Sequence, residues 1–338
     1  MIVEMKTGSS QGEVDDVVTK AKSLGLGVQL NMGTDKVVVA LLGSNTGQIP
    51  TDIFAVLPGV ESVTRIMKPY KLASREVRAK DTVVTVRGVP IGGKQVAVMA
   101  GPCAVENEAQ LLAAAKVVKE AGATVLRGGA FKPRTSPFSF QGLAVEGLKF
   151  LAKAREEYDI PVITEVIDPH DVELVAKYAD ILQVGSRNMQ NFRLLTEIGK
   201  SGHPVVLKRG FSCTVTEWLN AADYLLAQGN DKVILCERGI RTFEDSIRFS
   251  LDISAVAVIK RVSHLPILVD PSHAAGHHDF VPAIARSAIA AGADGLLIEV
   301  HPNPKEALVD GLQSLAPDQF NELMASLKPI AAAVGRQL

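Results

Sequence analysis

The stretch TVLRGGAFKPRTSPFSFQG concentrates positive charge in a short length of chain. It contains Arg127, Lys132 and Arg134, and no carboxylate lies between Glu120 and Glu146. The planar fork of arginine pairs with two oxygens of a phosphate or a carboxylate, and lysine supplies a compact positive charge. Because these cations have no counter-ion nearby in the sequence, we interpret them as part of a binding site for substrate phosphates.

The composition of the chain limits the class of protein. It has 338 residues, of which 47% are hydrophobic, and a formal net charge of −1. That length suits one large and one small domain, and that charge gives no basis for binding nucleic acid or an anionic membrane. No apolar run approaches the roughly 18 residues of a membrane-spanning helix. The start, MIVEMKTGSS, shows no secretory signal. Three cysteines fit reduced thiols, so we predict a cytoplasmic protein.

Eight short runs rich in β-forming residues follow one another along most of the chain, largely with helical patterns between them. The runs are 96–100, 124–127, 161–165, 181–185, 204–208, 232–236, 266–270 and 295–299. This alternation predicts an α/β fold, a (β/α)8 TIM barrel. A doubly wound sheet is the alternative, but no run is followed by the G-x-G-x-x-G turn of dinucleotide-binding folds.

Residues 1–66 have a different order, β-α-β-β-α-β, which predicts a small ferredoxin-like domain. Residues 67–81 are charged and mostly aperiodic, and we interpret them as a linker. The barrel domain would then span 82–338 and begin with a β-hairpin that has Gly92-Gly93 at its turn. The small domain has no paired acid and base and no cluster of metal-ligand types. It is therefore either a regulatory or oligomerisation module, or a packing element alone.

Polar side chains gather where the predicted strands end, and the active site of such a barrel is built at the C-terminal ends of its strands. In chain order, the residues at or shortly after those ends are Cys103, Arg127, Glu165, Gln183, Arg187, Lys208, Arg209, Glu237, Arg238, Asp270, His273, Glu299 and His301. One such residue alone is commonly a solvated loop residue. Nearly every strand ends in this way, however, and that regularity indicates a functional site.

The cations at this end of the barrel form one set. Its members are Arg127, Lys132, Arg134, Arg187, Lys208 and Arg238. So many positive charges around one opening would repel one another unless polyanions bind there. A single phosphate would not need all of them. The set therefore predicts two phosphorylated substrates, one of which also bears a carboxylate.

A second set contains the residue types that bind metal ions, which are Cys103, His273, Glu299 and Asp310. A thiolate, an imidazole and two carboxylates form a mixed set that suits a divalent first-row ion better than a structural zinc site. These residues are far apart in the sequence, but the closing of a barrel would make them neighbours. From the residues alone, these four side chains are either a metal site or a group of solvated loop residues.

Several segments of the chain are similar to the motifs of one enzyme family. They are GPCAVE, LRGGAFKPRTSPFSFQG, QVGSRNMQN, LKRG, LCERGIRTFE, LVDPSHAAG, and IEVHPNP followed by DGLQSL. Together they resemble 3-deoxy-D-arabino-heptulosonate 7-phosphate (DAHP) synthases, and in particular the bacterial subfamily related to 3-deoxy-D-manno-octulosonate 8-phosphate (KDO8P) synthases. The resemblance covers roughly residues 68–335. The N-terminal domain resembles the ferredoxin-like, ACT-like regulatory domain that some members carry.

The resemblance implies condensation of phosphoenolpyruvate with D-erythrose 4-phosphate, the entry step of the shikimate pathway of aromatic amino acid biosynthesis. It implies one divalent metal ion, such as Mn²⁺, Fe²⁺ or Zn²⁺, bound by Cys103, His273, Glu299 and Asp310. It implies that phosphoenolpyruvate is bound by Arg127, Lys132, Gln183, Arg187, Lys208 and Arg238, and the aldose phosphate by Arg134, Thr135 and Ser136. A homotetramer and feedback inhibition by an aromatic amino acid are further expectations.

The chemistry of this reaction suggests roles for individual residues. The metal would polarise the aldehyde oxygen as a Lewis acid, and C3 of phosphoenolpyruvate would attack the aldehyde carbon. Positive character would then develop at C2, where water adds before phosphate leaves. Glu165 and Glu237 are the carboxylates expected to stabilise that charge or to activate the water. Together with Lys132 and His273, they are the predicted catalytic residues.

Two other functions compete with this interpretation. One is KDO8P synthase, which uses arabinose 5-phosphate and in which the corresponding loop typically reads KANRSS, whereas this chain has KPRTS. That difference favours the four-carbon sugar. The other is a non-catalytic sensor of phosphosugars, for which the loss of a metal ligand or of Lys132 would be expected. All of these residues are present.

Overall fold

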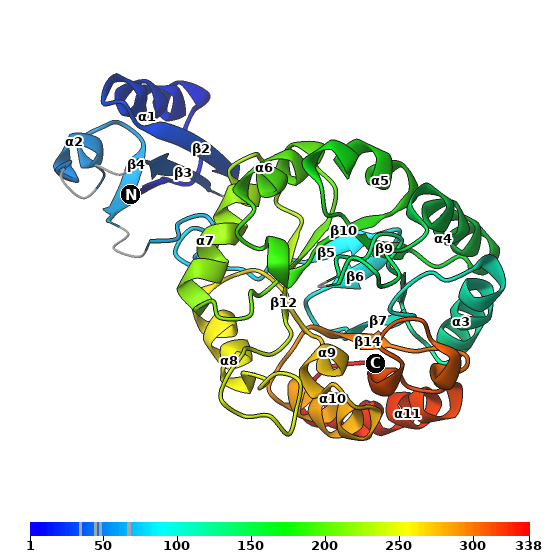
Figure 1. Cartoon of the computed structure of the whole chain (residues 1–338). Helices are drawn as coiled ribbons and strands as arrows, with labels where there is room; N and C mark the ends of the chain where they lie inside the picture. The colour runs from blue at the N-terminus through cyan, green and yellow to red at the C-terminus, as the bar shows by residue number, and fades with distance from the viewer. Residues whose placement is uncertain (34–35, 44–45, 47–48, 66–68, 135) are drawn as a thin grey trace. The chain divides into compact units, whose positions relative to one another are not determined.

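Two compact units make up the chain. The computed structural model describes residues 1–33, 36–43, 46, 49–65, 69–134 and 136–338, and it separates Met1–Ala79 from Lys80–Leu338 (Figure 1). Within that described part of the chain, none of the helices is both long enough and apolar enough to cross a membrane.

The first unit has the predicted ferredoxin-like fold. Its elements are β1 (Ile2–Met5), α1 (Gln11–Ser23), β2 (Gly27–Met32), β3 (Val37–Leu42), α2 (Asp52–Ala55) and β4 (Val60–Thr64). The strands pair in the order β2-β3-β1-β4, and all pairs are antiparallel. Helix α1 begins with a capping box, in which the Glu13 carboxylate accepts from the Ser10 backbone N–H at 2.7 Å. Val17 of α1 and Phe54 of α2 are both fully buried and belong to the same apolar core.

The segment interpreted as a linker is partly packed rather than solvated. Among its described residues, Ala73 and Ser74 are fully buried. Val77 forms a small apolar cluster with Ile2 of β1 and Val38 of β3. Tyr70 and Leu72 are buried as well, and the charged residues between these apolar positions are half-buried or exposed.

The second unit contains a closed barrel of eight parallel strands, which confirms the predicted fold. Its strands are β7 (Ala97–Gly101), β8 (Val125–Arg127), β9 (Val162–Glu165), β10 (Ile181–Val184), β11 (Val205–Lys208), β12 (Val233–Glu237), β13 (Ile267–Val269) and β14 (Gly295–Glu299). The barrel closes where β14 pairs with β7, from Gly295 opposite Ala97 to Glu299 opposite Gly101. Every predicted run overlaps one of these strands, with bounds that agree to within one residue at each end.

A ring of helices surrounds the barrel (Figure 1). It consists of α3 (Glu108–Glu120), α4 (Ala144–Tyr158), α5 (Val172–Tyr178), α6 (Phe192–Ser201), α7 (Val215–Leu226), α8 (Ile253–Val262), α10 (Val281–Ala290) and α11 (Pro317–Ala333), and a short helix α9 (Pro271–Ala275) follows β13. The connection from β12 to α8 is long and irregular. Its two ends are held together because Ile240 and Ser250 exchange backbone hydrogen bonds of 2.9 and 3.0 Å.

A β-hairpin precedes the barrel and packs at one end of its core. Strands β5 (Val84–Val86) and β6 (Val89–Ile91) contribute apolar side chains to the same buried cluster as the first residues of β7, β8 and β10. The hairpin therefore fills the N-terminal end of the barrel, and the C-terminal ends of the strands are left for a site.

The hairpin turn lies at Arg87-Gly88, so the predicted turn at Gly92-Gly93 is wrong. Val86 pairs directly with Val89, and the two residues between them have φ of 45° and 84°. A two-residue hairpin loop with positive φ at both positions matches the twist of the strands. Gly92 and Gly93 instead lie just after β6, where the chain turns toward β7.

Candidate active site

Many of the predicted site residues surround one cavity at the C-terminal end of the barrel. Of those residues, the lining includes Arg127, Lys132, Arg134, Ser136, Glu165, Gln183, Arg187, Lys208, Arg238, His273 and Asp310. Cys103 and Glu299 are buried and do not line it. Thr135 lies outside the described residues. One cavity thus brings together all six predicted cations and two of the four residues of metal-ligand type, His273 and Asp310.

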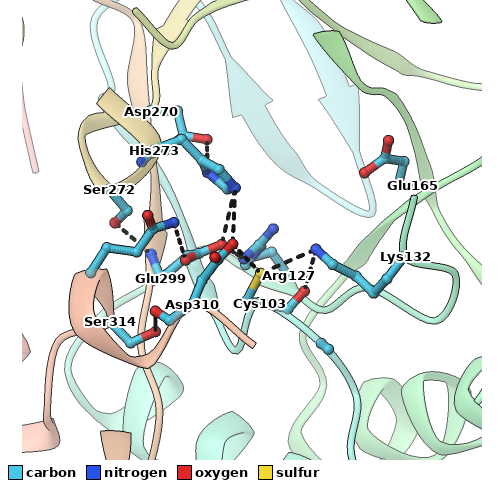
Figure 2. A network of polar contacts seen from close by, with 12 residues as sticks. Cys103, Arg127, Lys132, Glu165, Asp270, Ser272, His273, Glu299, Asp310 and Ser314 are labelled. Atoms are coloured by element: carbon cyan, nitrogen blue, oxygen red, sulfur yellow. Dashed lines mark hydrogen bonds and ion pairs between the residues drawn. The ribbon is translucent and has the colours of Figure 1, made fainter. Parts of the chain in front are cut away.

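The four residues of metal-ligand type converge. One ligand atom from each of Cys103, His273, Glu299 and Asp310 lies within 4.8 Å of the others (Figure 2). The Cys103 thiol donates to Asp310 Oδ2 at 3.3 Å, and His273 Nε2 is 3.4 Å from Glu299 Oε1. This donor set suits a divalent first-row ion. Burial raises the pKa of the Cys103 thiol, so an ion would have to displace its proton on binding.

Asp270 fixes the orientation of His273. Its Oδ1 accepts from the His273 backbone N–H at 2.9 Å and caps α9, while its Oδ2 lies 2.7 Å from His273 Nδ1. An Nδ1–H that donates to this carboxylate leaves the lone pair of Nε2 toward Glu299. Burial lowers the pKa of His273, which favours the neutral ring that a metal needs.

Glu299 is held as a carboxylate although it is fully buried. Its Oε1 accepts from Arg127 Nη1 and its Oε2 from Gln313 Nε2, both at 2.7 Å. Burial by itself would raise its pKa, but His273, Arg127 and Lys132 outweigh burial and the pKa is lowered. This position therefore supplies a negative charge to the cluster at neutral pH.

Two of the predicted cations have carboxylate partners, contrary to the expectation that these charges wait unpaired for a ligand. Arg127 pairs with Glu299 at 2.7 Å, and Lys208 Nζ lies 2.5 Å from Asp270 Oδ2. Both partners come from distant strands, so the sequence around the cations does not show them. The described residues offer no ion-pair partner within 4.0 Å to the other four, which are Lys132, Arg134, Arg187 and Arg238.

Glu165 lies at the cavity, whereas the structure does not bring Glu237 there. Glu165 Oε2 accepts from Gln183 Nε2 at 3.2 Å across neighbouring strands. Glu237 is fully buried, and its carboxylate binds Arg209 Nη1 at 2.9 Å and the Gly239 N–H at 2.8 Å. Side chains alternate along a strand, and the Cys236 side chain faces the barrel core, so its neighbour Glu237 must face outward.

Phe211, Arg248 and Phe249 line the cavity, although the sequence did not lead us to predict them as site residues. Arg248 lies 3.3 Å from Asp310 Oδ1 and donates to Gln313 Oε1 at 2.7 Å. Phe211 follows β11 by three residues, and its place near a strand end could have suggested it. Arg248 and Phe249 lie in the irregular connection before α8, where no periodic pattern marks them.

Comparisons with known proteins agree with one another. The model of the DAHP synthetase I family matches residues 76–334, and that of the DAHP synthase ferredoxin-like domain matches residues 1–68. The chain is 49% identical over 335 residues to phospho-2-dehydro-3-deoxyheptonate aldolase of Thermotoga maritima, covering 99% of both chains. A crystal structure of a Thermotoga maritima protein described as that enzyme, DAHP synthase, matches with a TM-score of 0.80 at 48% identity, covering 99% of this chain and 98% of that one.

Relatives named 2-dehydro-3-deoxyphosphooctonate aldolases are more distant. A 2-dehydro-3-deoxyphosphooctonate aldolase of Syntrophotalea carbinolica is 34% identical over 268 residues, which cover 74% of this chain and 96% of that protein. One from Geobacter sulfurreducens is 32% identical over 270 residues, covering 74% of this chain and 98% of its own.

The contact between Asp270 and His273 leads to a prediction about metal affinity. Asp270→Asn keeps the shape of the side chain but removes the charge that orients His273 and pairs with Lys208. We expect the affinity for Co²⁺ to fall about 10- to 100-fold, as is usual when such a supporting carboxylate is lost. The measurement is a titration followed by the thiolate-to-cobalt absorbance. Asp279→Asn, in the separate His277–His278–Asp279 cluster, is the control. Equal affinity in Asp270→Asn and the unmodified protein would contradict the prediction.

Proposed function

Because the chain belongs to the DAHP synthetase I family, we propose that it condenses phosphoenolpyruvate with D-erythrose 4-phosphate and water to give DAHP and phosphate. The observation that carries this proposal is a single cavity with four cations that lack carboxylate partners in the described chain. It adjoins the cluster of Cys103, His273, Glu299 and Asp310, the metal-type cluster. Two phosphorylated substrates explain such an excess of positive charge, and an electrophilic aldehyde explains the cluster beside it.

We assign phosphoenolpyruvate to the cations at or just after the C-terminal ends of β8, β10, β11 and β12. Arg187 and Arg238 have no carboxylate partner within the described residues, so they suit its doubly charged phosphate. Arg127 and Lys208 already share their charge with Glu299 and Asp270, so they suit its singly charged carboxylate. Gln183 and Lys132 line the same part of the cavity and would complete this subsite.

The aldose phosphate is assigned to the KPRTS loop. Arg134 and Ser136 line the same cavity as the residues for phosphoenolpyruvate. Arg134 donates weakly to the Phe140 carbonyl at 3.4 Å, a contact that a phosphate would replace. Thr135 keeps its predicted role, although it lies outside the described residues.

One divalent ion, such as Mn²⁺, Fe²⁺ or Zn²⁺, would be held by the cluster of Cys103, His273, Glu299 and Asp310. When bound, it would supply Lewis-acid polarisation of the aldehyde oxygen. Lys132 Nζ lies 3.1 Å from Cys103 Sγ, so its charge favours the thiolate that a metal needs. Lys132 therefore touches both the cluster and the phosphoenolpyruvate subsite.

We assign the work on C2 to Glu165 rather than to Glu237. Glu165 lines the cavity, and its carboxylate can accept a proton from the water that adds to C2 or stabilise positive charge there. Glu237 is occupied by Arg209 and turned away from the barrel interior. It supports the fold of the strand end instead.

The substrate proposal is tested by phosphate release from phosphoenolpyruvate with either aldose phosphate, before and after EDTA. We expect turnover with erythrose 4-phosphate, and a rate at least about tenfold lower with arabinose 5-phosphate. Chelation should abolish the activity and Mn²⁺ restore it, because the cluster offers four ligands to a divalent ion. Preference for the five-carbon sugar would overturn the assignment of the KPRTS loop. If metal analysis shows that the enzyme is free of metal and its activity is still full, the proposed divalent ion is overturned.

The assignment of the two glutamates is tested by a matched pair of variants. Glu165→Gln should lower kcat about 100-fold, a usual effect of losing an acid–base or charge-stabilising group. Glu237→Gln should lower the midpoint of thermal unfolding, because it breaks a buried ion pair, and should cost less than about tenfold in kcat. Steady-state kinetics and thermal unfolding of both variants decide the matter. An equal loss of kcat in the two would count against the assignment.

We also propose that the first unit binds an aromatic amino acid and lowers the activity, and that the chain forms a homotetramer. Residues 1–68 match the ferredoxin-like domain of DAHP synthases, which supports a regulatory role for the first unit. The described residues of this unit contain no cluster of metal-ligand types. We expect rates to fall in the presence of tyrosine or phenylalanine, with glycine as the control. Rates that are unchanged by either amino acid at saturating concentration would refute feedback control.

A further inference from the structure

Two phenylalanine rings lie beside Arg238 at the cavity. Phe211 follows β11, and Phe249 lies between β12 and α8. The rings are stacked, with centroids 5.0 Å apart and planes 11° apart. The guanidinium carbon of Arg238 lies over both rings, 4.0 Å from the centroid of Phe249 and 4.9 Å from that of Phe211. Two aromatic faces thus meet one arginine.

Arg238 is an arginine without the usual neutralising partner. Its side chain is buried, with the residue 4% exposed, and its Nη1 has no hydrogen-bond partner. No carboxylate of the described chain lies within ion-pair distance of it. Burial lowers its pKa to about 10, which leaves it charged at neutral pH. Arg127 and Lys208, in contrast, are each held by a carboxylate.

Aromatic support has a different consequence from support by a carboxylate. The negative face of an aromatic ring attracts a cation, and the guanidinium can stack on it with its flat side. The N–H groups lie in the plane of the guanidinium, so stacking leaves them available for a ligand. A carboxylate would occupy those N–H groups and compete with an incoming anion.

We propose that Phe211 and Phe249 are positioning residues, which hold the flat side of Arg238 so that its N–H groups bind the phosphate of phosphoenolpyruvate. This inference rests on the proposed function, because it needs the phosphate subsite at Arg187 and Arg238. The guanidinium carbon of Arg187 also lies over the Phe211 ring, at 5.4 Å. One aromatic platform therefore contacts both arginines of that subsite.

Backbone hydrogen bonds hold the chain at the position of each ring. The Phe249 N–H donates to the Ala274 carbonyl at 3.0 Å, next to the pairing of Ile240 with Ser250. The Phe211 carbonyl accepts from the Arg241 N–H at 2.7 Å. A support that is already in place avoids the cost of ordering Arg238 when the anion binds.

The test compares Phe249→Leu with Phe249→Tyr. Leucine keeps an apolar side chain without the aromatic face, and tyrosine keeps the face. For Phe249→Leu we expect about a tenfold rise in both the KM and the calorimetric Kd of phosphoenolpyruvate, about 1.4 kcal/mol. The KM of erythrose 4-phosphate should stay within about twofold, because the platform is proposed to serve the phosphate of phosphoenolpyruvate and not that of the sugar. Phe249→Tyr should restore most of the affinity. Phe243→Leu, fully exposed in the same connection, is the matched control.

A double-mutant cycle shows whether Phe249 acts through Arg238. In the Arg238→Lys background the flat guanidinium is absent, so Phe249→Leu should then change the Kd of phosphoenolpyruvate by less than about twofold. Phe211→Leu gives a second, independent readout should Phe249→Leu fail to fold. Equal losses in the leucine and tyrosine variants, or additive losses with Arg238→Lys, would overturn the proposal. Turnover of the unmodified protein with the two aldose phosphates tests the proposed function separately.

Discussion

The buried ion pair between Arg127 and Glu299 joins the two chemistries of this site. Arg127 ends β8 and Glu299 ends β14, and only β7 lies between these strands. One oxygen of Glu299 faces both Arg127, at 2.7 Å, and His273, at 3.4 Å. A buried pair of this kind is costly to break from one side, about 3 to 5 kcal/mol, because the remaining charge has no partner. The geometry of the cation set and that of the metal-type cluster therefore depend on each other.

The cavity keeps its positive charges by two different means. Arg127 is paired with Glu299 and Lys208 with Asp270, and each of these carboxylates also contacts His273. Arg238 lies over two aromatic rings, and no carboxylate of the described chain pairs with it. The first means gives rigid cations with little net charge, and the second gives a cation with its full charge. A substrate with a weakly charged end and a strongly charged end would find a matching partner for each.

Much of this could be predicted from the sequence, because buried parallel strands are continuous apolar runs and the residues after them must face one opening. The pairings could not, since Glu299 and Asp270 reach Arg127 and Lys208 from strands that are distant in the chain. The outward direction of the Glu237 side chain, in contrast, could have been predicted. Alternation places Cys236 toward the barrel core and Glu237 away from it. The position of Phe249 at the cavity could not be predicted, because the irregular connection around it has no periodicity that would place a side chain.

The hairpin of β5 and β6 limits how substrates and products can enter and leave the barrel. It fills the N-terminal end of the barrel, so substrates, water and products share the opening at the other end. The cations assigned to phosphoenolpyruvate are largely buried, as Arg127, Lys208 and Arg238 show, whereas Ser136 of the aldose loop is exposed. A sugar phosphate seated at the loop would stand in the way of anything bound more deeply. With the proposed subsites, the three-carbon acid would have to enter before the sugar phosphate occupies the loop.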